Sequence, residues 1–165
     1  MKQLILLFAV VTLFFSCSSK NSPKTIYIVR HAEKQLEGDD PGLAYVGGVR
    51  AKKLAQILED QEIKHVFSTD YKRTRLTAEP TALAAGVEIQ TYDPKNNDAL
   101  VAQLRSLDGN VLVVGHSNTV SQLANYFVGD QEKFADLTDL EYDFIYVVTL
   151  ESNSSSVVRK LYKDF

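Results

Sequence analysis

Three short runs of residues in this sequence combine arginine and histidine side chains that could act on an anion. The first is Arg30-His31-Ala32-Glu33, the second extends from Ser68 to Arg73, and the third is Gly115-His116-Ser117-Asn118. Guanidinium groups bind phosphate through charge-assisted hydrogen bonds, and a neutral imidazole nitrogen is a nucleophile at neutral pH. These residue types are therefore suited to holding a phosphoryl group and attacking it.

Each run follows a segment that has the pattern of a buried strand. Thr25–Val29 and Val111–Val114 are β-branched or apolar runs, and His65–Ser68 is a shorter one. The carboxyl ends of parallel strands meet at one edge of a sheet, where folds of this kind bind their ligands. The sequence therefore predicts one shared anion site, formed by Arg30, His31, Arg73 and His116.

The rest of the chain alternates between strand and helix patterns. Apolar spacing predicts helices over 47–60, 71–85, 97–107 and 119–128, and further strands over 87–92, 144–150 and 157–162. Pro80 lies inside the second helix and predicts a kink or break there. The alternation predicts one domain, a three-layer α/β/α sandwich with a mostly parallel sheet and a hairpin at its edge.

Composition and charge exclude several classes of protein. The chain has 165 residues, of which 45% are hydrophobic and 24% charged, values that exclude a disordered chain and a polytopic membrane protein. Its net charge of −3 argues against nucleic-acid binding by bulk charge. The single cysteine excludes an intrachain disulfide and a cysteine-based zinc site. An acidic protein of this kind must bind anions with a few focused cations.

The N-terminus has the pattern of an export signal. Lys2 precedes an apolar run over 4–15, too short for a bilayer that needs ~20 helical residues. Ser16-Cys17 resembles a bacterial lipoprotein processing site, and the residues after it have the composition of a flexible linker. We expect a lipoprotein-type signal peptide over 1–16, a lipid on Cys17, a tether over 17–24 and a domain over 25–165. The expected location is the cell envelope of a bacterium, periplasmic or at the outer membrane; an ordinary cleaved signal is the alternative.

In their order, the first run, the segment over 68–78 that contains the second, and the third run resemble the three signatures of the histidine phosphatase superfamily. This superfamily contains phosphoglycerate mutases and small phosphohistidine phosphatases. Residues 40–43 and 47 resemble its second loop, so the resemblance covers nearly all of the chain after the N-terminal segment. It implies a phosphoglycerate mutase-like fold and a phosphatase that needs no metal or cofactor and acts on small phosphorylated compounds. It also implies that His31 is the phosphorylated nucleophile, that Arg30 and Arg73 clamp the phosphoryl oxygens, and that His116 completes the pocket.

A leaving group needs a proton donor, and several carboxyl groups compete for this role. Asp93, at the end of the third predicted strand, is our preferred general acid, because many members of that superfamily use an acidic residue from a loop beyond the second motif. The alternatives are Glu33, close to the nucleophile, and then Asp98 and Asp143. The other interpretation of Asp93 is a turn former before the proline that follows it.

Two classes of function fit these residues: a phosphatase with a phosphohistidine intermediate on His31, or a non-catalytic binder of phosphorylated ligands. The intact histidine favours catalysis, because binding alone requires only cations. A phosphohistidine protein phosphatase is the alternative within the enzyme class. A mutase is less favoured, because the short connections after Arg73 and Arg105 leave little room for insertions that would enclose its substrate.

Overall fold

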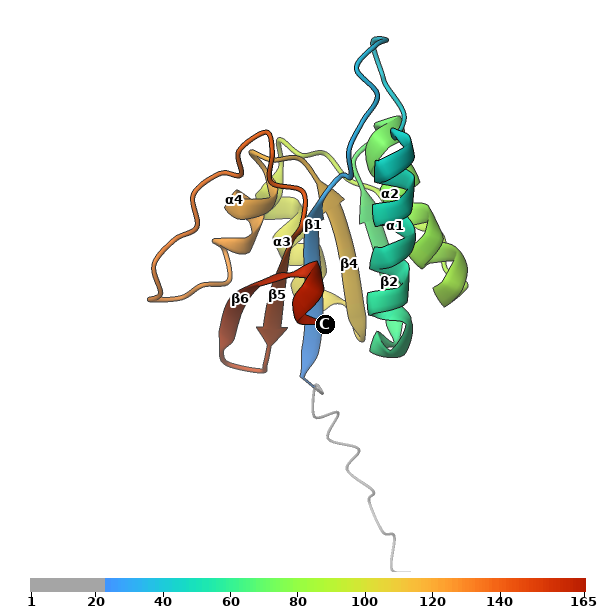
Figure 1. Ribbon diagram of the computed structural model, residues 1–165. Helices are drawn as coiled ribbons and strands as arrows, with labels where there is room; N and C mark the ends of the chain where they lie inside the picture. Colours follow the sequence, from blue (N-terminus) through green and yellow to red (C-terminus); the bar gives the residue numbers. More distant parts are fainter. Residues whose placement is uncertain (1–22) are drawn as a thin grey trace, which may run out of the picture.

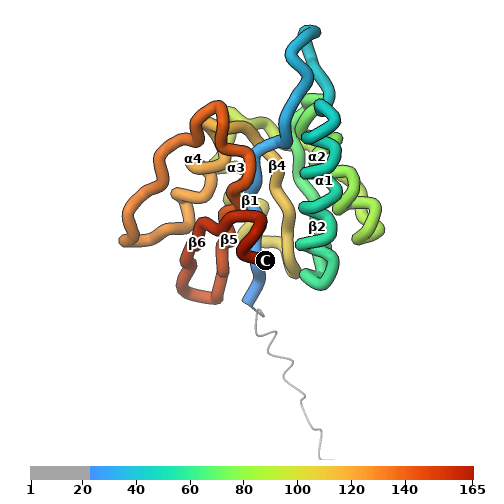
Figure 2. The backbone as a smooth tube through the Cα atoms, in the orientation of Figure 1, coloured from blue at the N-terminus to red at the C-terminus, as the bar shows by residue number. Residues whose placement is uncertain are grey.

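The computed structural model describes residues 23–165 (Figures 1 and 2). The predicted signal peptide, Cys17 and all but the last two residues of the predicted tether lie outside the described residues. Strand β1 begins at Lys24 and buries that side chain, so the domain starts one residue before the predicted boundary. Within residues 23–165, no helix has the length and apolar character needed to cross a bilayer.

Residues 23–165 form a six-stranded sheet with helices on both faces. The strand order is β3-β2-β4-β1-β5-β6; the first four strands are parallel, and the last two form an antiparallel hairpin beside β1. This confirms the predicted three-layer α/β arrangement with a mostly parallel sheet. The strands are β1 (Lys24–Arg30), β2 (Ile63–Ser68), β3 (Ile89–Thr91), β4 (Asn110–Gly115), β5 (Phe144–Leu150) and β6 (Ser155–Leu161). The helices are α1 (Tyr45–Leu58), α2 (Lys72–Ala85), α3 (Asn97–Ser106) and α4 (Val120–Ala124), with short 3-10 turns at Glu59–Gln61 and Tyr162–Asp164.

Helices α1 and α2 cover one face of the sheet, and α3 and α4 cover the other (Figure 1). Strand β1 contributes Tyr27 and Val29 to the core beneath α1 and α2, and Ile26 and Ile28 to the core beneath α3 and α4. This division follows from the two-residue period of a strand. The residues at 111–114 of β4 are fully buried, which explains their continuous apolar run.

Two predicted helices differ from the structure. Helix α2 runs through Pro80 without a break, although the proline has no N–H to donate to the carbonyl of Leu76. Both residues lie on a partly exposed side of the helix, where water can bind that carbonyl. Helix α4 ends at Ala124, because the side chain of Asn125 pairs with the backbone N–H and carbonyl of Phe134 at 2.8 and 2.9 Å. This pairing fastens the loop over 129–143 to the end of α4.

The loop between β1 and α1 projects beyond the C-terminal edge of the parallel strands (Figures 1 and 2). An isolated antiparallel bridge between Lys34 and Leu43 closes its base. Gly47 lets α1 approach this base, because a Cβ atom at that position would collide with the carbonyl oxygen of Glu33. The contact fixes the course of the backbone just after His31.

Candidate functional site

The four residues predicted to bind an anion line one cavity of about 520 Å³. Arg30 is the last residue of β1 and His31 follows it; Arg73 lies in the first turn of α2, and His116 follows β4. Arg30 is in register with Gly115 on the neighbouring strand, and the backbone N–H of His31 donates to the Gly115 carbonyl at 2.9 Å. The sheet pairing itself therefore brings the first and third sequence runs together.

The ring of His31 is buried and has one defined tautomer. Its Nδ1 lies 2.8 Å from the carbonyl oxygen of Ala32, and since a carbonyl only accepts, Nδ1 carries the proton and Nε2 keeps its lone pair. Burial lowers the pKa of His31 to about 4; the hydrogen bond to Ala32 opposes this shift, and the charges of Arg30 and Arg73 add to it. His31 is therefore a neutral imidazole with a free nitrogen at neutral pH.

The backbone next to His31 is held by helix α2. The N–H of Ala32 donates to the hydroxyl of Thr77 at 2.9 Å, and that hydroxyl donates to the carbonyl of Arg73 at 2.7 Å. Ala32 and Thr77 are both fully buried. This short chain of hydrogen bonds connects the peptide that orients the His31 ring to the helix that carries the second guanidinium.

The second imidazole, His116, faces the first. The ring centroids of His31 and His116 are 5.6 Å apart, at an interplanar angle of 67°. Nε2 of His116 shares a hydrogen bond of 2.9 Å with the buried hydroxyl of Thr69. Burial, and then the charges of Arg73 and Arg30, lower the pKa of His116 to about 4. The cavity thus holds two neutral imidazoles between two guanidinium groups.

The guanidinium of Arg30 is buried and is clamped by the loop before β5. Nη1 donates to the carbonyls of Thr138 and Glu141 at 2.8 and 3.2 Å, and Nη2 donates to the hydroxyl of Tyr142 at 3.3 Å. The Tyr142 ring covers one side of the group, 4.0 Å from Cζ. Nε is buried and has no hydrogen-bond partner among the described residues. A buried unpaired donor beside a cavity is what an oxygen of a bound anion would satisfy.

Arg73 is arranged in a similar way. Its Cζ lies 4.4 Å from the ring centroid of Tyr71, and that ring meets His116 edge-on at 5.1 Å. Nη1 of Arg73 is 3.7 Å from a carboxylate oxygen of Asp40, while Nε is buried and unpaired within residues 23–165. Each guanidinium therefore has a tyrosine ring on one side and an unused N–H, an arrangement that limits its orientations before an anion binds.

The structure does not bring Asp93 into the cavity. Its carboxylate accepts a hydrogen bond from the backbone N–H of Lys95 at 2.9 Å, and its carbonyl accepts one from Asn96 at 3.0 Å. Asp93 thus closes a turn, and the cavity wall is formed by its neighbours Pro94 and Lys95. This geometry favours the turn-former interpretation over the general-acid role that the sequence predicted.

The alternative carboxyl groups do not line the cavity either. Glu33 accepts hydrogen bonds from Nε and Nη2 of Arg50 at 3.0 and 2.6 Å. Burial is the largest single influence on the pKa of Glu33 and would raise it, but the hydrogen bonds to Arg50 and to the backbone and the charges of Arg50 and Arg30 together lower it. Asp98 accepts from the hydroxyl of Tyr126 at 2.8 Å, and Asp143 lies outside the lining.

The carboxyl group that does line the cavity belongs to Asp139, which the sequence analysis missed. It is solvent-exposed and lies 3.9 Å from Nη2 of Arg30. The loop over 129–143 has no strand or helix period and no motif, so no sequence pattern indicates that it folds over the end of β1. Lys34 and Lys95 also line the cavity, and neither was predicted from the sequence.

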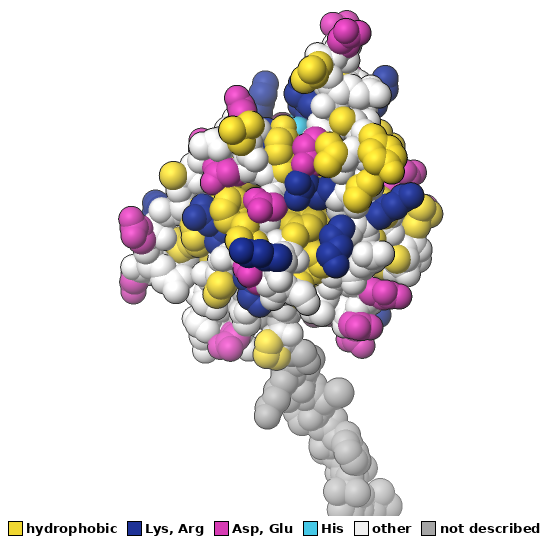
Figure 3. Space-filling view, in the orientation of Figure 1, with side chains coloured by type: hydrophobic (Ala, Val, Ile, Leu, Met, Phe, Trp, Pro, Cys, Tyr) yellow, Lys and Arg dark blue, Asp and Glu magenta, His cyan; other side chains and the backbone are white. Residues whose placement is uncertain are grey.

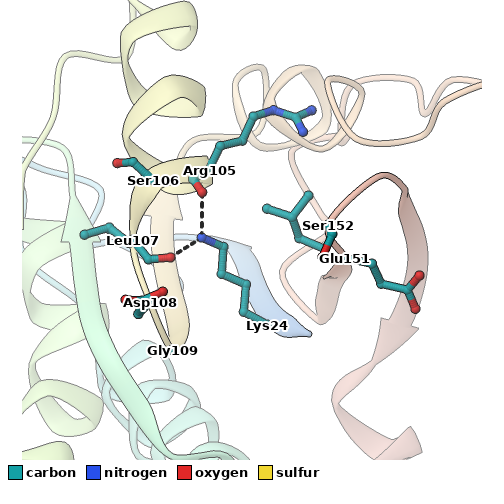
Figure 4. Close-up of a pocket in the computed structure, with 9 residues that line it drawn as sticks. Lys24, Arg105, Ser106, Leu107, Asp108, Gly109, Glu151 and Ser152 are labelled. Atoms are coloured by element: carbon teal, nitrogen blue, oxygen red, sulfur yellow. Dashed lines mark hydrogen bonds between the residues drawn. The ribbon is translucent and has the colours of Figure 1, made fainter. Parts of the chain in front are cut away.

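A second cavity, of about 310 Å³, lies near the start of β1 at the opposite end of the sheet (Figure 4). The amine of Lys24 donates to the carbonyls of Arg105 and Leu107 at the end of α3, a helix terminus that favours a cation. Burial lowers the pKa of Lys24. His65 lies nearby, with Nε2 3.1 Å from the carbonyl of Asp108. The polar groups here are engaged in structural contacts.

Comparison with known proteins gives a family match over the first part of the domain. Residues 26–94, which contain Arg30, His31 and Arg73 but not His116, match the model of the histidine phosphatase superfamily (branch 1). Over 82 residues the chain is 45% identical to 6-phosphofructo-2-kinase/fructose-2,6-bisphosphatase 4 of Homo sapiens, covering 46% of this chain and 17% of that protein. Over 104 residues it is 35% identical to the "Probable phosphoglycerate mutase GpmB" of Citrobacter koseri, covering 59% and 44%. The matched part of the chain spans less than half the length of each of these relatives.

Solved structures show the same fold over most of the chain. The protein histidine phosphatase SixA complexed with tungstate is similar with a TM-score of 0.71 at 18% identity, covering 85% of this chain and 98% of that one. A phosphoglycerate mutase from Bacillus anthracis has a TM-score of 0.67 at 14% identity, covering 86% and 94%. The chain therefore matches the histidine phosphatase superfamily in sequence over residues 26–94, and it shares the fold of these solved structures.

Proposed function

We propose that this protein is a phosphatase that hydrolyses phosphorylated compounds through a phosphohistidine intermediate on His31. The observation that carries the proposal is the state of that ring: it is neutral, its Nδ1 is bonded to Ala32 at 2.8 Å, and Nε2 is free. Arg30 and Arg73 line the same cavity and each has an unpaired Nε. A nucleophile placed beside two anion-binding groups is what phosphoryl transfer requires.

In the proposed mechanism, Arg30 and Arg73 hold the phosphoryl oxygens. The Nε2 lone pair of His31 attacks phosphorus while the P–O bond to the leaving group breaks, and the departing oxygen takes that electron pair and a proton. Water then attacks phosphorus and gives up a proton, the P–N bond breaks, and its electrons return to Nε2. The guanidinium groups stabilise the charge of the transferring group, and we propose that they do so without a metal ion.

The proton for the leaving oxygen needs a source inside the cavity. Asp139 is the carboxyl group that lines it, whereas Asp93 is occupied in a turn. We therefore assign the general-acid role to Asp139 in place of Asp93. Protonation by a positioned carboxyl group contributes most when the leaving group is a poor one.

Trapping of the phosphoenzyme tests the proposal. The full chain, purified in a neutral detergent, is mixed with a phosphate ester labelled at phosphorus and quenched within milliseconds. We expect a labelled protein that loses its label in acid and keeps it in alkali, as a phosphoramidate does, and hydrolysis that persists in the presence of EDTA. His31→Ala should abolish labelling and turnover, while His65→Ala, outside the cavity, should change neither.

Two results would contradict the proposal. Turnover by His31→Ala at the wild-type rate would exclude His31 as the nucleophile. Tight binding of tungstate or phosphate without labelling or turnover would identify the protein as a non-catalytic binder of phosphorylated ligands.

A phosphohistidine protein phosphatase remains the second candidate. The observation that favours it is the match to SixA, since this chain covers 98% of that protein histidine phosphatase and shares its compact size. To test this candidate, the full chain is assayed with two substrates: a small protein that carries phosphohistidine, and a small phosphate ester. A kcat/KM at least a hundredfold higher for the protein would favour this candidate.

We also propose that the chain is a lipoprotein of the bacterial cell envelope, anchored through a lipid on Cys17. The course of β1 supports this arrangement, because its seven residues separate Lys24, next to the N-terminal segment, from the cavity by about 20 Å. A membrane anchor at that end would leave the cavity open to its substrate. Metabolic labelling with palmitate should mark the wild-type protein but not Cys17→Ala, and a variant still bound to membranes would contradict the anchor.

A further inference from the structure

We infer that the ion pair between Glu33 and Arg50 positions the nucleophile, because it fixes the peptide whose carbonyl sets the tautomer of His31. Neither Glu33 nor Arg50 lines the cavity, so both are positioning residues that act through that peptide. The inference rests on the proposed function in one respect: it takes His31 as the group that attacks phosphorus. It adds a task for a charged pair that the proposed mechanism does not use.

The ion pair acts on the same peptide unit that orients the His31 ring. The carbonyl of Ala32, which accepts the Nδ1 proton of His31 at 2.8 Å, and the nitrogen of Glu33 belong to one planar group of atoms. A rotation of this plane would move the carbonyl oxygen away from Nδ1. The peptide on the other side of Ala32 is held by Thr77, whose hydroxyl accepts the Ala32 N–H at 2.9 Å. The orientation of the ring therefore also depends on how Glu33 is held.

Helix α1 holds Glu33 by its backbone and by its side chain. The N–H of Ala44, just before α1, donates to the Glu33 carbonyl at 2.9 Å, and Gly47 lets the helix pack against that carbonyl. Arg50 follows Gly47 by three residues and so lies on the same face of the helix. Its Nε donates to both carboxylate oxygens of Glu33 at 3.0 Å, and its Nη2 donates to Oε1 at 2.6 Å. Three hydrogen bonds from one planar guanidinium fix the direction of the Glu33 side chain.

The pair is withdrawn from solvent, unlike the other ion pairs of the domain. Charged side chains of both signs are scattered over the face seen in Figure 3, and exposed ion pairs contribute little to stability. Glu33 and Arg50 are 20% and 24% exposed, whereas each of the other three ion pairs within residues 23–165 has a partner that is at least 37% exposed. Removing two charges from water costs free energy, so the geometry that this pair imposes explains its position better than stability does.

The guanidinium of Arg50 also contacts the C-terminal turn. Its Cζ lies 5.5 Å from the ring centroid of the buried Tyr162, which is within cation–π range. The N–H of Tyr162 donates to the carbonyl of Asp143 at 3.0 Å, and this bond holds the turn beside the start of β5. The guanidinium would lose the contact with the ring if it turned away from Glu33. The fold therefore limits Arg50 to the orientation that holds the peptide.

Substitution of the pair tests the inference by two measurements on the full chain in a neutral detergent. Long-range ¹H–¹⁵N NMR spectra of the free protein report the His31 tautomer. Rapid-quench kinetics with p-nitrophenyl phosphate give the rate constant for phosphoenzyme formation and the substrate concentration at half saturation. Arg50→Ala and Glu33→Ala should each show an Nε2–H population of His31 and a rate constant lower by about five- to a hundredfold. The concentration at half saturation should change less than about twofold, because both arginines of the cavity are intact.

Conservative variants separate positioning from a merely structural role. Glu33→Gln keeps an oxygen for the Nε and Nη2 donors, so it should retain the tautomer and a rate constant within about threefold of the wild type. Arg50→Lys keeps the charge and the apolar stem and should fold, but it lacks the planar fork, so it should also show the Nε2–H population and a lower rate constant. Arg75→Ala is the matched control, because Arg75 pairs with Asp70 at 3.0 Å outside the cavity lining, and it should change neither measurement.

The outcomes separate this inference from the proposed function. A wild-type tautomer in Arg50→Ala, a lower rate constant without a change of tautomer, or equal losses in Glu33→Gln and Glu33→Ala would each overturn the inference. A tautomer that depends on the pair, in a protein that forms no phosphoenzyme, would support the positioning of the ring and overturn the phosphatase activity.

Discussion

The ring of Tyr142 lies over the guanidinium of Arg30, with 4.0 Å between Cζ and the ring centroid, and its hydroxyl accepts a hydrogen bond from Nη2 at 3.3 Å. The ring restricts the plane of the buried guanidinium, so it acts as a positioning residue. Tyr142→Ala should lower kcat/KM between about twofold and thirtyfold, the range expected from the loss of one cation–π contact. Tyr142→Phe keeps the ring and should retain most of the activity in steady-state assays.

Tyr126→Ala is the matched control, because that tyrosine hydrogen-bonds to Asp98 and does not line the cavity. Its kcat/KM should stay at the wild-type value. If Tyr142→Phe lost as much activity as Tyr142→Ala, the hydroxyl rather than the ring would hold Arg30.

The two imidazoles of the cavity should titrate far below an ordinary histidine. Burial is the main cause that lowers the pKa of His31 and of His116 to about 4, so both rings should stay neutral at pH 5. Long-range ¹H–¹⁵N NMR spectra report both the titration and the tautomer, and should show the proton of His31 on Nδ1. A midpoint near 6.5 for either ring would contradict the described environment.

The same pKa shifts make stability depend on pH. Between about pH 4 and 6.5 the unfolded chain binds more protons at these histidines than the folded chain does. The free energy of unfolding therefore has its full contribution from these two histidines above pH 6.5, and it falls as the pH is lowered toward 4. Urea unfolding at pH 7 and pH 5 should show this loss, and the double variant His31→Gln/His116→Gln should lose less between the two pH values.

Thr77 and Thr81 provide a matched pair of substitutions on helix α2. Thr77→Val removes the acceptor of the buried Ala32 N–H, so the free energy of unfolding should fall by ~1–3 kcal/mol and kcat should fall with it. The hydroxyl of Thr81 is buried without a partner among the described residues, so Thr81→Val should be neutral or stabilising. Chemical denaturation and steady-state kinetics compare the two. Equal losses would show that helix packing, rather than the hydrogen bond to Ala32, is responsible.

Substitution of Asp139 tests the proton donor. Asp139→Asn should slow hydrolysis of an alkyl phosphate roughly a hundredfold and that of p-nitrophenyl phosphate much less, because a good leaving group needs little protonation. Asp93→Asn should slow both substrates little, since its carboxylate accepts a hydrogen bond from the Lys95 N–H in a turn and does not line the cavity. If instead Asp93→Asn slowed the alkyl phosphate much more than p-nitrophenyl phosphate and Asp139→Asn did not, Asp93 would be the general acid, as the sequence predicted.

The sheet, its layers and the convergence of four side chains could be predicted from the residue pattern. The hydrophobic period of each segment gives its type, and parallel strands in a covered sheet place their carboxyl ends at one edge. Four side chains lie at or just after the ends of strands: Arg30, His31, Arg73 and His116. Local pattern and topology together therefore suffice to predict their shared cavity. The ends of helices were less predictable. Helix α4 stops before Asn125, whose side chain pairs with the backbone of Phe134 in the following loop, and the apolar spacing of the helix does not reveal this contact.

The other groups of the site could be identified only from the folded chain. Asp93 and Glu33 are close in sequence to site residues, yet a turn and an ion pair with Arg50 keep their carboxylates out of the cavity wall. Asp139 and Tyr142 are more than a hundred residues from Arg30, in a loop without periodicity, yet they contact it. The position of such a loop depends on long-range contacts such as the hydrogen bonds from Arg30 to the carbonyls of Thr138 and Glu141, and these form only when β1 is in place in the sheet. The sequence therefore specifies what regular elements bring together, while irregular segments are placed by the packing of the complete fold.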